Sequence, residues 1–116
     1  MKKKNTENYL ERIPVRAEHI GWSLDGDSVT LEIENKGIMN RIFQVLLKKP
    51  KITYIHLDEN GSFVWQQIDG NLSITEIGMA VSERFGNDAE PLYERLAQFF
   101  KILETNKFIG FRGERK

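Results

Sequence analysis

Two histidines and a small group of acidic residues are the side chains whose types could do chemistry. His56, Asp58 and Glu59 fall within four residues and could in principle hold a metal ion, since imidazole and carboxylate are common metal ligands. The same spacing is more typical of a strand end followed by a turn and a helix cap. Ser62 follows a glycine but lacks the G-x-S-x-G frame of a hydrolase nucleophile, and His19 belongs to no nucleophile or phosphate-binding motif. We therefore predict no catalytic residue, no metal and no cofactor.

Length and composition predict one folded domain. The chain has 116 residues, of which 40% are hydrophobic and 29% charged, which is too apolar for global disorder. The absence of cysteine excludes disulfides, thiolate nucleophiles and cysteine-based metal sites. The lysines at the start precede no apolar segment that could be a signal or a membrane span. We expect a cytoplasmic domain over 1–116 with no membrane partner, a flexible arm over 1–14 and a flexible tail over 112–116.

The first half of the chain has the pattern of strands. Residues 28–34 alternate apolar and polar side chains, and the preceding segment 19–24 is separated from them by an Asp-Gly turn dipeptide. This pattern predicts a hairpin with one wet face. A third strand is predicted over 52–57, which is β-branched and aromatic. Between them, apolar pairs recur every four residues over 38–47 and predict a short amphipathic helix.

Three helices are predicted in the second half. The first covers about 60–68, with Asp58 or Asn60 as its cap and Gly70 just past its end. The second begins with the S-x-x-E spacing of a capping box and ends at a glycine, over 73–86. The third covers about 90–105, with a proline near its first position. Residues 107–112 form either a final short strand or an extended tail.

The block "LDENGSFVWQQIDG" gathers four large apolar side chains in a short helical segment. Phe63, Val64, Trp65 and Ile68 are predicted to hold the first helix across the sheet. A direct contact of Trp65 with a ligand is the alternative. This block, together with "ITEI" and the later "FFKIL" and "FI", resembles the PqqD family, whose members are also called RiPP recognition elements. The resemblance covers roughly 41–109.

The resemblance implies an α+β, winged-helix-like fold, in which a three-stranded antiparallel sheet is followed by three helices. It implies that the protein is a non-catalytic peptide-binding chaperone and not an enzyme. Such proteins bind the leader segment of a ribosomally made precursor peptide and present it to a modifying enzyme, often a radical SAM enzyme. The leader adds as a strand to the third strand, in a groove beside the third helix. The segment 38–47 departs from the minimal element of the family.

Transferred by position, the groove lies between 51–58 and 90–105. The implied peptide-binding residues belong to the third strand and the third helix: Lys51, Ile52, Thr53, Tyr54, Ile55, His56, Leu57, Tyr93, Leu96, Phe99, Phe100 and Leu103. Both sets of alternate strand residues are partly apolar, so either could face outward.

A helical wheel of the third helix gives an apolar arc wider than one packing layer requires. Its core stripe is predicted to be Leu92, Leu96, Phe99 and Leu103, extended on one side by Tyr93, Ala97 and Phe100 and on the other by Ile102. A guest peptide could cover the excess, and so could the strand and 38–47.

A winged-helix regulator that binds DNA is the first alternative. Phosphate neutralisation needs basic residues on the recognition helix, whereas 88–104 contains four acidic and two basic residues. This net charge argues against a nucleic-acid partner. An adaptor that binds only a partner enzyme is the second alternative, and the sequence does not separate it from the peptide carrier.

Overall fold

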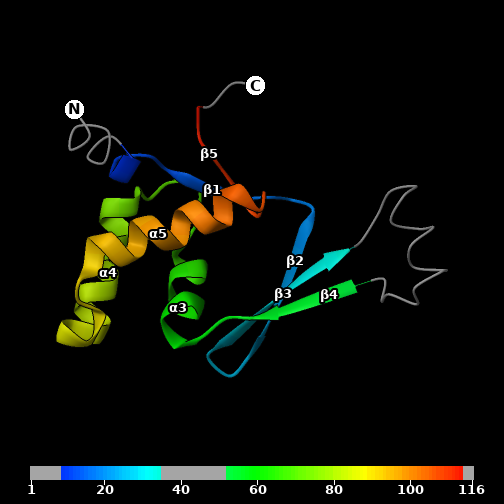
Figure 1. The fold of residues 1–116 in the computed structure, drawn as a ribbon, viewed down its shortest axis with the longest axis horizontal. Helices are drawn as coiled ribbons and strands as arrows, with labels where there is room; N and C mark the ends of the chain where they lie inside the picture. The colour runs from blue at the N-terminus through cyan, green and yellow to red at the C-terminus, as the bar shows by residue number, and fades with distance from the viewer. Residues whose placement is uncertain (1–8, 35–51, 114–116) are drawn as a thin grey trace.

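A computed structural model describes residues 9–34 and 52–113 (Figure 1). The elements in chain order are β1 (Pro14–Arg16), β2 (Ile20–Asp25), β3 (Ser28–Glu34), β4 (Ile52–His56), α3 (Glu59–Gln67), α4 (Ile74–Phe85), a 3-10 turn (Gly86–Ala89), α5 (Leu92–Thr105) and β5 (Ile109–Phe111). The helix predicted over 38–47 lies outside the described residues. No helix in the two described ranges is long and apolar enough to cross a membrane.

The three predicted strands form one antiparallel sheet in the order β2-β3-β4. Asp25 pairs with Ser28 across the turn, where Gly26 has a φ of 65°, a conformation that costs glycine little. The alternation in β3 is confirmed, because Val29 and Leu31 are fully buried on one face. The prediction of a three-stranded antiparallel sheet followed by three helices is therefore confirmed, while the winged-helix comparison stays a prediction.

A second sheet of two strands joins the two ends of the described chain. β1 pairs antiparallel with β5, with Pro14 opposite Phe111. Residues 109–111 are thus a strand, which settles the choice left open for 107–112. The sequence did not predict β1, and Figure 1 shows this pair lying beside α5, apart from the three-stranded sheet.

Part of the expected flexible arm 1–14 packs into the core. Tyr9 is buried, its ring lies 5.5 Å from that of Phe111, and the guanidinium of Arg12 lies 4.2 Å from the Phe111 ring centroid. The backbone N–H of Ile74 donates to the carbonyl of Arg12. Residues 9–14 are therefore tied to α4 and β5, a correction of the arm's boundary; residues 1–8 lie outside the described residues.

The helix starts follow the sequence signals. Asp58 caps α3 by accepting a 2.7 Å hydrogen bond from the Gly61 N–H, which selects Asp58 over Asn60. Ser73 and Glu76 form the predicted capping box of α4. These side chains satisfy backbone N–H groups that a helix start leaves without partners.

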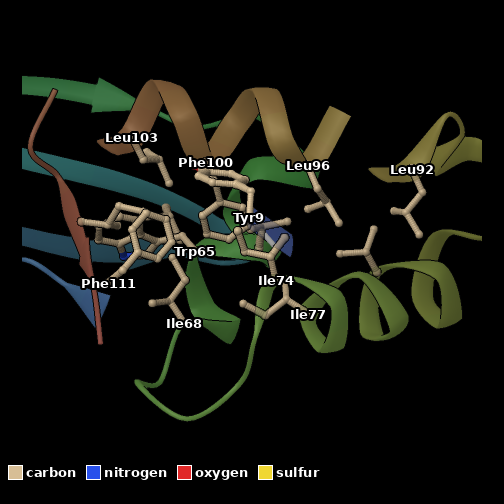
Figure 2. Packing of buried hydrophobic residues seen from close by; sticks show 14 of the residues in the cluster. Tyr9, Trp65, Ile68, Ile74, Ile77, Leu92, Leu96, Phe100, Leu103 and Phe111 are labelled. Atoms are coloured by element: carbon tan, nitrogen blue, oxygen red, sulfur yellow. The ribbon is translucent and has the colours of Figure 1, made fainter. Parts of the chain in front are cut away.

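The core lies where α3, α4 and α5 meet the sheet (Figure 2). Val64 and Trp65 of α3 and Ile68 at its C-cap are buried, and Phe63 is partly buried against the same core, which confirms the predicted role of the apolar block and excludes Trp65 as a surface contact. α4 and α5 approach closely at Gly78, where a Cβ would lie 2.9 Å from Leu96 Cδ1. The helices thus form one packed unit that holds α5 in a fixed position relative to the sheet.

Candidate functional site

β4 lies at one edge of the three-stranded sheet in the described part of the chain. The Leu57 N–H donates to the Val29 carbonyl at 2.9 Å, in register with the pairing of Ile55 and Leu31. Antiparallel pairs alternate between those that exchange hydrogen bonds and those that do not. The backbone groups of the alternate residues Ile52, Tyr54 and His56 therefore point away from β3, toward the open edge.

Side chains on β4 divide between the two faces of the sheet. Ile55 and Leu57 pack against the core cluster, on the face that also carries Leu31. Tyr54 and His56 lie on the opposite face, where Tyr54 is 56% exposed. The sequence left open which set of alternate residues of this strand faces outward. The residues whose backbone points to the edge carry their side chains on the face away from the core.

A groove of about 500 Å³ lies between the end of β4 and α5. One wall is the segment from His56 to Gly61, which includes the start of α3. The other wall is α5, and the floor is apolar. The lining residues are His56, Leu57, Asp58, Asn60, Gly61, Val64, Val81, Ala89, Leu92, Arg95, Leu96, Gln98, Phe99 and Ile102.

The α5 wall presents a stripe that differs from its buried stripe. Arg95, Phe99 and Ile102 recur at intervals of three and four residues, which places them on one side of the helix. Ile102 is 52% exposed. A Cβ added to Gly61 would lie 3.4 Å from Phe99 Cζ, an ordinary van der Waals distance, so the Phe99 ring lies next to the start of α3. The apolar part of the groove is therefore accessible between α5 and α3.

Ser62 connects the groove wall to the sheet. Its hydroxyl accepts a 2.9 Å hydrogen bond from the Val29 N–H and donates to the Leu57 carbonyl at 3.2 Å. This hydroxyl bridges the two strands where their direct ladder ends, and Ser62 is fully buried. The serine that the sequence analysis considered only as a nucleophile therefore fixes the end of β4 against α3.

Three polar side chains of the groove lining, those of His56, Asp58 and Arg95, have hydrogen-bond partners within the protein. His56 Nδ1 lies 2.9 Å from Thr30 Oγ1, and Asp58 caps α3. Arg95 donates to the backbone carbonyls of Asp88 and Glu90, at 3.3 Å each. No group of three or more potential metal ligands occurs within the two described ranges. The arrangement offers hydrogen bonds from a strand edge and apolar contacts, which is the chemistry of binding an extended chain.

The predicted site residues fall into several groups. His56, Leu57, Leu96 and Phe99 line the groove. Residues 52–55 form the rest of the edge strand but are not part of the groove lining. Lys51 lies outside the described residues.

Three predicted residues of α5 lie elsewhere. Phe100 and Leu103 are buried in the core, so their assignment to a peptide surface is corrected. Tyr93 packs toward Gly78 of α4. The correction has a simple cause: the buried stripe runs through Phe100, and Phe99 turns toward the groove.

Sequence reasoning missed several of the groove residues. Arg95, Gln98 and Asn60 carried no signal that separated them from solvated positions. Gly61 did carry one, because a glycine inside a helix often marks a close approach. Ile102 carried a signal as well, because the helical wheel places this apolar residue beside the predicted core stripe.

Comparisons with known proteins identify a similar fold and a family. A solved structure described as "TbiB1 in Complex with the TbiA(beta) Leader Peptide" matches with a TM-score of 0.60 and 19% sequence identity, over 88% of this chain and 99% of that one. At this identity the match shows the fold. A comparison with curated proteins gives no match. The family model described as "Coenzyme PQQ synthesis protein D (PqqD)" matches residues 44–109, more than half of the chain. The chain therefore belongs to the PqqD family.

Proposed function

We propose that this protein is a non-catalytic peptide-binding chaperone. It captures the leader segment of a ribosomally made precursor peptide by strand addition to β4 and presents the precursor to a modifying enzyme of the radical SAM class. The observation that carries the proposal is the edge strand β4 ending beside an accessible apolar groove on α5. Family membership supports it, and so does the similar fold of TbiB1, which was solved with a leader peptide.

The energetics of strand addition require the groove as well as the edge. Each backbone hydrogen bond contributes about 0.5–1.5 kcal/mol, whereas ordering each residue of a flexible peptide costs about 1–2 kcal/mol. The hydrogen bonds of strand pairing alone therefore contribute little more than the cost of ordering the peptide. Micromolar affinity needs about 8 kcal/mol, and each buried apolar anchor contributes about 1.5–3 kcal/mol. Leu57, Phe99 and Ile102 provide the surface on which such anchors of the leader would pack.

The direct test is a titration of isotope-labelled protein with the leader of a precursor encoded beside its gene. We expect amide shifts concentrated on β4 and on the groove face of α5. The N–H groups of Tyr54 and His56 should become protected from hydrogen exchange, because they point to the open edge. Shifts confined to other surfaces, or no binding at millimolar leader, would rule out the proposal.

A matched pair of substitutions separates the groove from general surface effects. Ile102→Glu places a charge in the groove at a half-exposed position, and we expect leader affinity to fall at least tenfold. Met79→Glu makes the same change on α4 at a residue that is 62% exposed and does not line the groove. It should leave affinity within twofold of the wild type. Equal affinity of both variants would contradict the proposed site.

The partner enzyme is tested separately. We expect a partner enzyme of the radical SAM class to bind the protein–leader complex and to modify the precursor faster when the protein is present. A precursor modified at the same rate without the protein would remove the chaperone role and leave peptide binding alone.

A further inference from the structure

Arg95 is the arginine of the groove lining, and its guanidinium is held at the α5 wall. Nη1 donates to the backbone carbonyls of Asp88 and Glu90, at 3.3 Å each. Both bonds use one terminal nitrogen, so within the described part of the chain the N–H groups of Nε and Nη2 have no hydrogen-bond partner. A guanidinium that is already fixed through one nitrogen loses little further conformational freedom when it binds an anion.

Two carboxylates close to Arg95 in the structure are bonded to backbone N–H groups. Asp58, which lines the same groove, accepts from the Gly61 N–H at 2.7 Å. Glu90, whose carbonyl Arg95 contacts, accepts from the Leu92 N–H through Oε1 at 3.2 Å. Among the described residues, no carboxylate forms an ion pair with Arg95. Its positive charge is therefore available to a partner that enters the groove.

We propose that Arg95 selects a leader that carries an acidic side chain, aspartate or glutamate, beside its apolar anchors. The inference rests on the proposed function, because it names the chemistry of the peptide that the same groove takes. The N–H groups of Nε and Nη2 form a planar fork that matches the two oxygens of a carboxylate. A basic side chain of the leader at this position would instead meet a like charge, so the arginine also discriminates against leaders of the wrong sign.

The spacing along α5 sets where in the leader this acidic residue lies. Arg95 and Phe99 are one helical turn apart on the groove side, which is about 6 Å along the helix axis. In an extended peptide, residues two positions apart point to the same side and are separated by about 6.6 Å. A leader that runs along the groove and packs an apolar side chain on Phe99 therefore places the residue two positions away beside Arg95. The expected pattern is an acidic residue two positions from an apolar anchor.

Burial of the groove by the peptide strengthens this ion pair. An exposed pair contributes little, because water and salt screen it. Leu92 and Leu96 line the groove beside Arg95 and are buried, so a bound leader removes water from a site that already has an apolar floor. The lower local dielectric raises the attraction between the two charges. The pair adds specificity to the affinity that the apolar anchors provide.

An exchange of charges between protein and peptide tests the pair. Calorimetric titration of the full chain uses the leader of a precursor encoded beside its gene and a set of leader variants, each with one acidic residue replaced by lysine. We expect one of these replacements, two positions from an apolar anchor, to lower affinity at least tenfold. Arg95→Glu should lower affinity for the unchanged leader by a similar factor. It should bind that one lysine variant within threefold of the affinity of the original pair.

Lys101→Glu is the matched control. It makes the same change of charge on α5, at an exposed residue that does not line the groove, and it should leave leader affinity within twofold of the wild type. A second measurement does not depend on charge reversal. Affinity of the wild type should fall as salt concentration rises, and this dependence should be weaker in Arg95→Gln, because salt screens the ion pair. Thermal melts verify that all variants fold.

Three results would overturn the inference: equal affinity of the wild type and Arg95→Glu for the leader, no recovery of affinity in the exchanged pair, or a leader that binds in the groove without an acidic residue. Each of them leaves the proposed function standing, provided that the amide shifts still fall on β4 and on the groove face of α5. A wild type that does not bind the leader would refute the proposed function, and the inference with it.

Discussion

The two apolar faces of α5 differ in what they contact, and neighbouring phenylalanines show the difference. Phe100 is fully buried among the core residues, and Phe99 is half-buried on the groove. Their rings lie 5.9 Å apart. One face of the helix therefore holds the fold together, whereas the other remains available to a ligand. Stability and binding should respond to different substitutions on the same helix.

The largest expected effect is on the buried face. Phe100→Ala should lower the free energy of unfolding by about 3–5 kcal/mol, because it leaves a cavity in the core. Phe99→Ala should cost less than half as much and should weaken leader binding instead. Urea unfolding followed by circular dichroism measures the first quantity, and calorimetric titration measures the second. Equal losses of stability in the two variants would break the distinction between the faces.

The wall opposite α5 depends on a hydroxyl with no direct part in binding. Ser62→Ala leaves the buried Val29 N–H and the Leu57 carbonyl without their shared partner, and an unsatisfied buried polar group costs about 1–3 kcal/mol. We expect that loss in unfolding experiments, together with faster hydrogen exchange at Val29. Ser62→Thr keeps the hydroxyl but adds a methyl group in a buried site, so steric strain sets its cost. An unchanged exchange rate of the Val29 N–H in the alanine variant would show that the Ser62 hydroxyl does not fix the end of β4.

Local signals predicted much of this structure. The turn at Gly26, the capping box at Ser73 and the cap at Asp58 each depend on residues within a few positions, so their patterns are visible in sequence. The apolar block of α3 was predicted as core because it concentrates large side chains between caps. These elements place β4 next to the start of α3, and hence one wall of the groove.

Long-range features could not be predicted in the same way. β1 has three residues, starts with proline and pairs with a strand at the other end of the chain, so no local period marks it. The helical wheel gave α5 a wide apolar arc, but it could not show which part faces the core. That choice depends on where α4 packs, at Gly78, and it places Phe100 in the buried stripe and Phe99 on the groove. The bridge that the Ser62 hydroxyl makes between Val29 and Leu57 likewise forms only when β3, the end of β4 and α3 have come together.

The end of α5 offers the smallest effect and the clearest separation of stability from binding. Lys107 has a φ of 65°, the Phe108 N–H donates to the Leu103 carbonyl, and the Lys107 N–H donates to that of Glu104. This is a Schellman motif with lysine where glycine is usual. Lys107→Gly removes the left-handed strain, worth about 1–2 kcal/mol, but gives the unfolded chain more freedom, which costs about 0.4–1 kcal/mol.

The net result of Lys107→Gly should be a gain of about 0.5 kcal/mol in the free energy of unfolding, with leader affinity unchanged, because Lys107 does not line the groove. Lys107→Ala removes the charge and keeps the strain, so it should give no gain. If the glycine variant instead bound the leader differently, the end of α5 would influence the groove. The two faces of α5 would then be coupled through the helix and would not respond independently to substitution.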